Sequence, residues 1–226
     1  MGKFDSSSKT EGQVCCTKSN NIYITGGTHG NLYNWTGNMA SKPINAHNGQ
    51  KVHCLVEKKY EVYSGGADGS IFRWKKAANG SISGQATLFI SLNSAYEQLM
   101  RDVKPFPEEF GVLSLDFAGE GDECLVATKG CCVFHYKGER FKLVQQGHYK
   151  GELWGLACSP HENIFITGGD DKTVRQWDIK AKKEITRVYQ EEKIRGLDWS
   201  NDGDKIVVAD NDARLFLFDN KLRLKN

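Results

Sequence analysis

Residues 147–178, GHYKGELWGLACSPHENIFITGGDDKTVRQWD, decide the fold of this chain. The stretch begins with Gly147-His148 and ends with Trp177-Asp178, and a GGDDK turn separates two runs rich in β-branched and aromatic residues. Such runs on either side of a glycine-containing turn favour a pair of antiparallel strands. The stretch therefore predicts a small antiparallel sheet whose two ends are marked by Gly-His and Trp-Asp.

Weaker copies of this pattern recur along the chain. In each copy a large aromatic residue follows a turn residue by six positions, in the pairs His29–Trp35, Asp68–Trp74, Gly130–Tyr136, Asp171–Trp177 and Asp212–Phe218. Successive aromatic residues lie 39, 62, 41 and 41 positions apart, and a period of about 40–45 residues is typical of WD-repeat propeller blades. The sequence predicts an all-β fold, a WD-repeat β-propeller with five recognisable four-stranded blades.

The repeats also divide the chain. The polar segment 1–11 is expected to be disordered, and a basic tail, 220–226, follows the last blade. Residues 77–109 interrupt the period as an insertion, in which a Gly/Ser turn is followed by SLNSAYEQLMRDV (91–103), the pattern of a short amphipathic helix. The array covers residues 12–219, with blades expected at 12–40, 46–76, 110–140, 147–190 and 192–219.

Two blades carry a set of polar residues that can stabilise the blade edge. In blade 4 the Trp indole N–H can reach a Thr hydroxyl while Asp accepts from His; the residues are His148, Thr167, Asp171 and Trp177, and blade 2 has His47, Ser64, Asp68 and Trp74. A His–Ser/Thr–Asp set could instead form a catalytic triad, but a set that recurs at blade spacing indicates a structural network. Blades 1, 3 and 5 lack members, so packing is expected to hold their edges.

Partner binding is expected on the rim where first strands begin and b–c loops gather, a b–c loop being the turn between a blade's second and third strands. The position after the first core apolar residue is Cys15, His53, Leu113, Trp154 or Arg195 in the five blades. Trp154 and Arg195, together with Tyr149 and Lys150, have the composition of a protein-binding hot spot, and His53 is a further candidate. Alternatively, Trp154 packs between neighbouring blades.

The composition suits a β protein, with 39% hydrophobic residues and 24 glycines in 226 residues. No apolar run approaches the roughly 18 residues of a spanning helix. The net charge is +2, but the first 76 residues hold ten Lys or Arg against five Asp or Glu. A second basic cluster consists of Lys180, Lys182, Lys183, Arg187, Lys193 and Arg195. These clusters either favour an acidic partner or are solvated turns; nucleic-acid binding is not expected, since no dense basic stripe with exposed aromatics is present.

The seven cysteines are odd in number and contain no C-x-x-C pair, which favours free thiols in a reducing compartment over disulfides or metal ligands. The chain has no G-x-S-x-G elbow, H-E-x-x-H helix or phosphate loop. We therefore expect no enzyme activity, no cofactor and no small-molecule substrate. The start MGKFDS fits the acceptor pattern for myristoylation at Gly2, and a single acyl chain would give at most weak membrane contact.

GHYKGELWGLACSP, followed by FITGGDDKTVRQWD, resembles the echinoderm microtubule-associated protein-like family, in which a GH-x-x-ELWGLA-x-x-P blade recurs. The segments NIYITGGTHGNLYNWTGN, AHNGQKVHCLVEKKYEVYSGGADGSIFRW and GVLSLDF resemble the blades that precede it there. The resemblance covers about residues 12–219. It implies two joined propellers, tubulin or microtubule binding, and a cytoskeletal or ciliary setting.

Five blades fall short of that double array, so either the chain is a fragment or its blades close differently. A family-like order of blades would make Gly147 the junction of two propellers. The function expected is a non-enzymatic WD-repeat scaffold in the cytoplasm and cytoskeleton that binds tubulin or microtubules. The alternative is a generic adaptor in a ciliary transport or ubiquitin-ligase complex.

Overall fold

The computed structural model of the chain describes residues 11–95, 110–118, 121–148 and 151–225. Within these ranges all regular structure is β-strand. The strands form five antiparallel sheets, which belong to two compact units, residues 1–146 and 147–226. The expected all-β fold is confirmed, and each sheet corresponds to one blade of a partial WD propeller.

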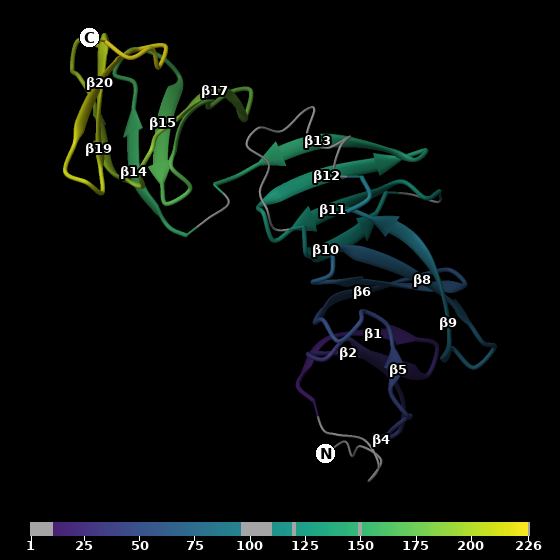
Figure 1. The fold of residues 1–226 in the computed structure, drawn as a ribbon. Helices are drawn as coiled ribbons and strands as arrows, with labels where there is room; N and C mark the ends of the chain where they lie inside the picture. Colours follow the sequence, from purple (N-terminus) through teal and green to yellow (C-terminus); the bar gives the residue numbers. More distant parts are fainter. Residues whose placement is uncertain (1–10, 96–109, 119–120, 149–150, 226) are drawn as a thin grey trace. The chain divides into compact units, whose positions relative to one another are not determined.

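The first unit holds the sheets of blades 1, 2 and 3 (Figure 1). Within each sheet consecutive strands pair antiparallel, and β5 pairs with β3 in addition. Blade 1 contains β1 (Gln13–Ser19), β2 (Ile22–Gly27), β3 (Asn31–Thr36), β4 (Met39–Ala40) and β5 (Ile44–Asn45). Blade 2 contains β6 (Val52–Lys58), β7 (Glu61–Gly66), β8 (Ser70–Lys76) and β9 (Ile82–Ser91). Blade 3 contains β10 (Val112–Phe117), β11 (Cys124–Thr128), β12 (Cys132–Lys137) and β13 (Arg140–Gln146).

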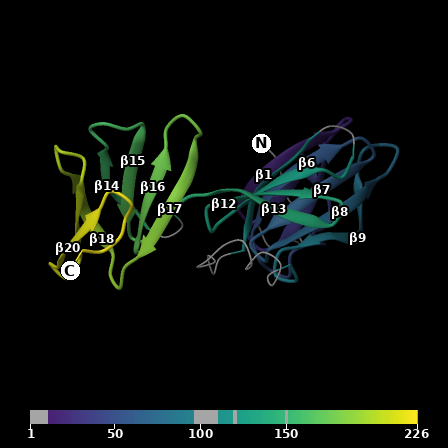
Figure 2. The same ribbon diagram turned by 90° about the horizontal axis from the view of Figure 1, so that it is seen from above.

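The second unit holds the sheets of blades 4 and 5. Figure 2 shows the strands of blade 4 side by side. They are β14 (Leu153–Cys158), β15 (Ile164–Gly169), β16 (Thr173–Asp178) and β17 (Lys183–Tyr189). Blade 5 contains β18 (Ile194–Trp199), β19 (Lys205–Asp210) and β20 (Leu215–Asp219). The unit begins at Gly147, where the family resemblance implies a junction of propellers; that a first propeller ends there stays a prediction.

The aromatic spacing read from the sequence follows from one turn geometry in all five blades. The residue after each turn anchor has a left-handed backbone, with φ of 79° at Gly30, 76° at Gly69, 55° at Cys131, 62° at Lys172 and 59° at Ala213. A positive φ in a short turn lets two antiparallel strands follow directly on each other. Each aromatic residue then pairs with the residue twelve positions earlier on the second strand, as in Trp74↔Val62 and Trp177↔Phe165.

Hydrophobic cores form between neighbouring blades of the same unit. Ile24 and Leu32 of blade 1 pack with Val62 and Trp74 of blade 2, and all four are at most 1% exposed. On the other face of blade 2, Tyr63 and Ile71 pack with Val126 and Phe134 of blade 3. In the second unit Ile166 and Val174 pack with Ile206 and Val208. Each blade of a unit is thus stabilised by burying one face against its neighbour.

The interruption after blade 2 is shorter than expected. Residues 82–91, assigned to the insertion, are β9, the fourth strand of blade 2, so blade 2 does not end at residue 76. The pairing explains the error, because Thr87 and Leu88 lie opposite Arg73 and Phe72, an association between distant residues that leaves no local signal. Of the expected helix over 91–103, residues 92–95 form a turn and residues 96–103 lie outside the described ranges.

Blade 5 and the two ends of the array also differ from expectation. The sheet of blade 5 has three strands, and blade 1 has five. The segment after β20 is not simply a solvated tail, because Leu222 is 3% exposed and Leu224 forms an isolated bridge with Phe218. At the other end, Glu11 is 8% exposed and hydrogen-bonded. Glu11 is therefore part of the folded structure, although the sequence assigned it to the disordered segment 1–11. Residues 1–10, including Gly2, lie outside the described ranges.

Candidate protein-binding site

A β-bulge near the start of each first strand sets which side chains reach the rim. The pairing register shifts at Gln13/Cys15, Val52/Cys54, Val112/Ser114, Leu153/Gly155 and Ile194/Gly196. A bulge leaves one residue unpaired and re-aims its side chain. The residues at the bulges are Val14, His53, Leu113, Trp154 and Arg195. Four of the five positions named from sequence are therefore the bulge residues, whereas in blade 1 the equivalent residue is Val14 rather than Cys15.

The same rim position brings each bulge close to a b–c turn. In every blade a turn amide donates to the carbonyl oxygen two residues before the bulge, as in Asp170 N to Glu152 O at 2.9 Å and Asn211 N to Lys193 O at 2.8 Å. The corresponding turn residues in blades 1 to 3 are Thr28, Ala67 and Lys129. Because the backbone geometry repeats, the chemistry of each rim position is set by the two side chains that the sequence places there.

In the second unit these positions hold a connected polar cluster, here called the rim cluster: Trp154, Asp170, Lys193, Arg195 and Asn211. The indole Nε1–H of Trp154 donates to Asp170 Oδ1 at 3.0 Å. Trp154 is 51% exposed, so its ring lies on the surface and is not packed between blades. The interpretation of Trp154 as a core residue is therefore wrong for the described part of the chain.

Arg195 links blade 5 to blade 4. Its Nη1 lies 3.1 Å from Asp170 Oδ1, its Nε–H donates to Asn211 at 2.8 Å, and its guanidinium lies 5.0 Å from the centre of the Trp154 ring. An arginine held by a carboxylate, an amide and an aromatic face has little freedom left to lose on binding. The side chains of the rim cluster are thus preorganised.

The charge of Asp170 is stabilised within the cluster. Burial alone would raise the pKa of Asp170, but the hydrogen bonds from Trp154 and the Glu152 amide, with the charges of Lys193 and Arg195, lower it below the ordinary aspartate value. Lys193 Nζ lies 3.6 Å from Asp170 Oδ2. Two cations against one carboxylate leave the rim cluster with a net positive charge.

The remaining rim candidates lie elsewhere. His53 occupies the bulge of β6 in the first unit and is partly buried. Burial, followed by the charges of Lys51 and Lys129, lowers the pKa of His53 below the usual histidine value. His53 is therefore neutral at physiological pH. Tyr149 and Lys150 lie outside the described ranges.

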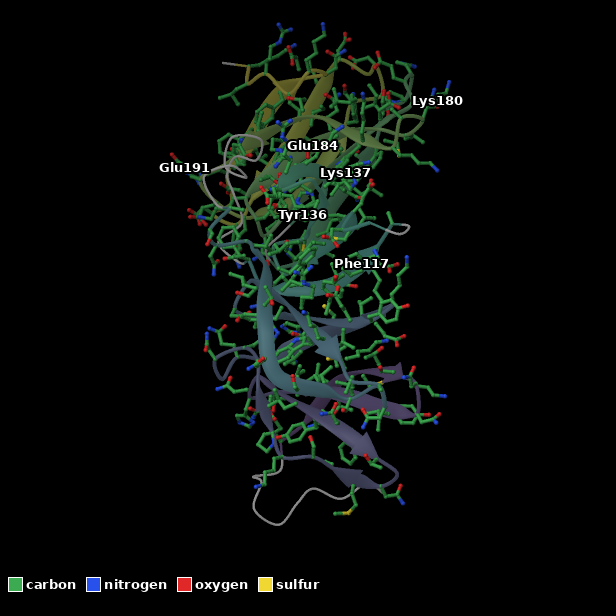
Figure 3. All side chains as sticks on the ribbon, turned by 90° about the vertical axis from the view of Figure 1, so that its right-hand side faces the viewer. Phe117, Tyr136, Lys137, Lys180, Glu184 and Glu191 are labelled. Atoms are coloured by element: carbon green, nitrogen blue, oxygen red, sulfur yellow. The ribbon has the colours of Figure 1, made fainter. Side chains whose placement is uncertain are left out.

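The C-terminal basic cluster named from sequence is partly neutralised. Arg187 Nε lies 2.5 Å from Oε1 of Glu184, a residue labelled in Figure 3. Lys193 and Arg195 both contact Asp170. Lys180, Lys182 and Lys183 are exposed at the β16–β17 turn and the start of β17. The six basic residues therefore do not form one uniform cationic surface.

In blade 4, the four residues named from sequence form a hydrogen-bonded chain. Trp177 Nε1–H donates to Thr167 Oγ1 at 2.7 Å, and that hydroxyl lies 2.8 Å from His148 Nε2. Because the Asp171 carboxylate can only accept, His148 Nδ1 donates to Asp171 Oδ1 at 2.8 Å, and in the neutral imidazole Nε2 then accepts from the Thr167 hydroxyl. Burial opposes ionisation of Asp171, but bonds from His148 and Thr173 and the charge of Arg175 lower its pKa below the ordinary value.

Blade 2 repeats this chain. Trp74 Nε1–H donates to Ser64 Oγ at 2.9 Å, Ser64 lies 2.9 Å from His47 Nε2, and His47 Nδ1 lies 2.9 Å from Asp68 Oδ1. His47 and Ser64 are 0% exposed. The Ser64 hydroxyl already interacts with two side chains and is closed to solvent, which is the arrangement of a structural network rather than of a nucleophile.

Blade 1 contains a substitute that the sequence analysis missed. Glu11 Oε1 accepts from the Tyr33 hydroxyl at 2.8 Å, and its other oxygen accepts from the His29 amide. A Cβ on Gly27 would overlap the Glu11 carboxylate, just as a Cβ on Gly66 would overlap the His47 ring. Glu11 therefore occupies in blade 1 the place of the histidine in blade 2. The edge of blade 1 is held by hydrogen bonds, including Trp35 Nε1–H to Thr25 at 2.8 Å, and not mainly by packing.

No group of three or more potential metal-binding side chains gathers among the described residues. In the same ranges, no helix has the length and apolarity needed to cross a membrane. All seven cysteines are free thiols. Burial raises the pKa of Cys15 and of Cys124 to about 12 and that of Cys54 to about 11, which keeps these thiols protonated and unreactive.

Comparison with known proteins finds one repeat model and several relatives that are similar to this chain. The family model described as WD domain, G-beta repeat matches residues 139–178 and 183–219. Human echinoderm microtubule-associated protein-like 2 is 28% identical over 97% of this chain and 31% of its own length. The 77 kDa echinoderm microtubule-associated protein of Strongylocentrotus purpuratus is 25% identical over 88% of this chain and 27% of its own length. Mouse echinoderm microtubule-associated protein-like 3 is 26% identical over 88% of this chain and 22% of its own length.

The chain thus spans less than a third of the length of these relatives. The matched repeats are offset by one strand from the sheets: the first contains β13 and β14–β16, and the second contains β17 and β18–β20. The similarity to the relatives extends through the first unit as well. The chain is therefore a WD-repeat protein related to the echinoderm microtubule-associated proteins.

Proposed function

We propose that this chain is a non-enzymatic scaffold that binds tubulin or microtubules through the rim cluster of the second unit. The relatives are named as microtubule-associated proteins and match nearly the whole chain. A location in the cytoplasm on the cytoskeleton, including the cilium, belongs to the same proposal.

The observation that carries the proposal is the half-exposed Trp154. Tryptophan and arginine dominate protein-binding hot spots because they combine a large apolar area with directed polar groups. Here the Trp154 ring is held by Asp170 and covered on one side by Arg195, so its orientation is set before any partner arrives. Blades 2 and 3 have no tryptophan at the equivalent position, because the bulge residue is His53 in blade 2 and Leu113 in blade 3.

Co-sedimentation with taxol-stabilised microtubules tests the proposal. The whole chain is expected in the pellet, and Trp154→Ala is expected to shift it to the supernatant. Truncation of a hot-spot residue costs about 2 kcal/mol or more, equivalent to an affinity loss of at least about 30-fold. Tyr23→Ala is the matched control, because Tyr23 is an aromatic residue of similar exposure, 52%, on β2 of blade 1.

Two outcomes would contradict the proposal. A wild-type chain that stays in the supernatant would favour the generic adaptor instead. Equal losses of microtubule affinity for Trp154→Ala and Tyr23→Ala would show that the rim cluster is not part of the interface, even if the chain binds microtubules. Thermal unfolding of each variant shows whether its fold is intact.

A further inference from the structure

A second surface, in the first unit, is suited to an acidic partner. A cavity of about 320 Å³ opens at the end of blade 2 where β6 turns into β7, and its wall includes Lys58, Lys59, Tyr60, Lys75 and Lys76. The rim bulge lies at the start of β6, near Val52, whereas the cavity lies at the end of the same strand. The cavity is therefore at the opposite end of the blade from the rim.

Two of the lysines are fixed in place by their surroundings. The Lys58 ammonium lies 4.2 Å from the centre of the Phe117 ring and donates to the Gly121 carbonyl oxygen; Phe117, the last residue of β10, is labelled in Figure 3. Lys76 Nζ lies 2.5 Å from Glu57, and the Lys76 side chain is 8% exposed. Lys58 therefore holds a fixed positive charge at this wall, whereas the charge of Lys76 is paired with Glu57.

Lys75 and Tyr60 leave charge and ring area available for a partner. Lys75 is exposed, and the described residues place no carboxylate in salt-bridge contact with it. Tyr60 is 83% exposed, the highest exposure among the large hydrophobic residues of the described ranges. An ammonium beside an exposed tyrosine can bind a carboxylate and the apolar stem that carries it.

The carboxylates of the cavity do not cancel this charge. Four lysines and two acidic residues, Glu61 and Asp122, line the cavity, and Glu57 pairs with one of the lysines, Lys76. Glu61 accepts from the Tyr63 hydroxyl at 2.7 Å and lies 3.6 Å from Arg73, so its charge is already offset. Asp122 is exposed at the border of the cavity.

The hairpin turn that carries Lys59 and Tyr60 is built against local preference. Lys59 has a φ of 49°, a left-handed conformation that is unfavourable for a residue with a side chain. In blade 1 the same turn uses Asn20 with a φ of 52°, and asparagine tolerates this conformation better. The two blades therefore use the same turn geometry at this end.

We propose that this cavity is a docking site for an acidic polypeptide segment, whose glutamate or aspartate side chains pair with the lysines while its backbone packs on Tyr60. A polypeptide is favoured over a phosphate polymer because the exposed Tyr60 ring offers an apolar surface on which an aliphatic stem can pack. This surface is independent of the rim cluster, since the two lie in different units of the chain.

Fluorescence anisotropy with a labelled oligoglutamate peptide tests the site on the whole chain. Binding is expected at an ionic strength of about 0.01 M and is expected to weaken at about 0.15 M, where the screening length falls from about 30 Å to about 8 Å. Lys75→Glu is expected to raise the dissociation constant at least about 10-fold, a change of about 1.4 kcal/mol. Lys75→Gln is expected to have a smaller effect in the same direction, and Tyr60→Ala to weaken binding as well. The matched control is Lys142→Glu, an exposed lysine on β13 outside the cavity.

Three results would overturn the inference. Oligoglutamate that does not bind, or that binds no better than oligoglutamine, removes the site. Equal losses of peptide affinity for Lys75→Glu and Lys142→Glu would show that the peptide is attracted by the net charge of the chain and not by this cavity. Binding of single-stranded oligodeoxythymidylate with the same dependence on Lys75 would identify a polyanion site instead. Because Trp154→Ala is expected to leave oligoglutamate binding unchanged, failure of the microtubule proposal and failure of this one are distinguishable.

Discussion

Arg175 and Asp171 form an ion pair in which neither side chain is exposed to solvent, with Nη2 and Oδ2 2.8 Å apart. Arg175 lies opposite Thr167 in the sheet, where blade 2 has Phe72 opposite Ser64. The guanidinium also approaches Thr173 and Glu184. Blade 4 therefore contains a charged core where blade 2 has an aromatic ring, and the His148 network depends on the compensation of Asp171 by Arg175.

Removing Arg175 is expected to destabilise the second unit strongly. Arg175→Ala leaves Asp171 as an uncompensated buried charge, which typically costs about 3–5 kcal/mol. Urea unfolding measures the loss as a lower midpoint. Arg223→Ala serves as the control, because Arg223 pairs with Asp219 through a side chain that is 73% exposed and exposed pairs contribute at most about 1 kcal/mol. Similar losses in both variants would contradict the importance of the buried pair.

The stability of the second unit is expected to depend on the ionisation of Asp171 at acid pH. Its pKa is lower in the folded chain than in the unfolded chain, so its stabilising contribution is present above about pH 4 and is lost as pH falls through the folded pKa. Asp171→Asn is expected to unfold more easily at neutral pH and to show a weaker loss of stability between pH 4 and more acid conditions. Urea midpoints over this range measure the difference; parallel pH profiles would contradict it.

Glycine at the b–c turn of blade 5 is expected to stabilise the chain. Ala213 is exposed and has a φ of 59°, so Ala213→Gly relieves a left-handed strain of about 1 kcal/mol. Ala78→Gly is the control, since Ala78 is an exposed turn residue without a positive φ. We expect a higher urea midpoint for the first variant and an unchanged or lower one for the second. A lower midpoint for Ala213→Gly would be evidence against the strain.

Glu11 is expected to contribute to the stability of blade 1. Glu11→Ala leaves the Tyr33 hydroxyl and the His29 amide without their acceptor, at a cost of about 1–3 kcal/mol. Glu11→Gln keeps one carbonyl oxygen and is expected to lose less. Hydrogen exchange of the β2 and β3 amides reports the local effect. Unchanged protection in Glu11→Ala would show that packing alone holds this edge.

Thiol titration tests the burial pattern of the cysteines. Cys16, Cys131 and Cys158 are exposed, whereas the other four are partly or fully buried. We expect three thiols to react rapidly with a chromogenic disulfide reagent in the native chain and all seven after unfolding in denaturant. Fewer than seven in the unfolded chain would indicate a disulfide, and more than three rapid ones in the native chain would contradict the described packing.

The repeat itself can be read from the sequence, because it rests on local chemistry. The step of six residues from turn anchor to aromatic residue reflects a turn and a strand of constant length. The His–Ser/Thr–Asp–Trp sets could be named in the same way, since side chains at constant spacing in a constant hairpin reach the same partners. The structure places Ser64 Oγ 2.9 Å from Trp74 Nε1 and 2.9 Å from His47 Nε2, as the residue types predict.

Contacts between segments without a shared local pattern were decided only by the tertiary structure. β9 was hidden inside an apparent insertion, because its pairing with β8 is a property of the sheet and not of its own residues. Glu11 was assigned to a disordered segment, because a glutamate before a strand gives no sign that it replaces a histidine. The rim cluster depends on two β-bulges and on the stacking of blades 4 and 5, which bring Trp154, Asp170 and Arg195 together. The residue types can be read directly from the sequence. Close contacts between distant residues depend instead on strand register and on the packing of one sheet against the next.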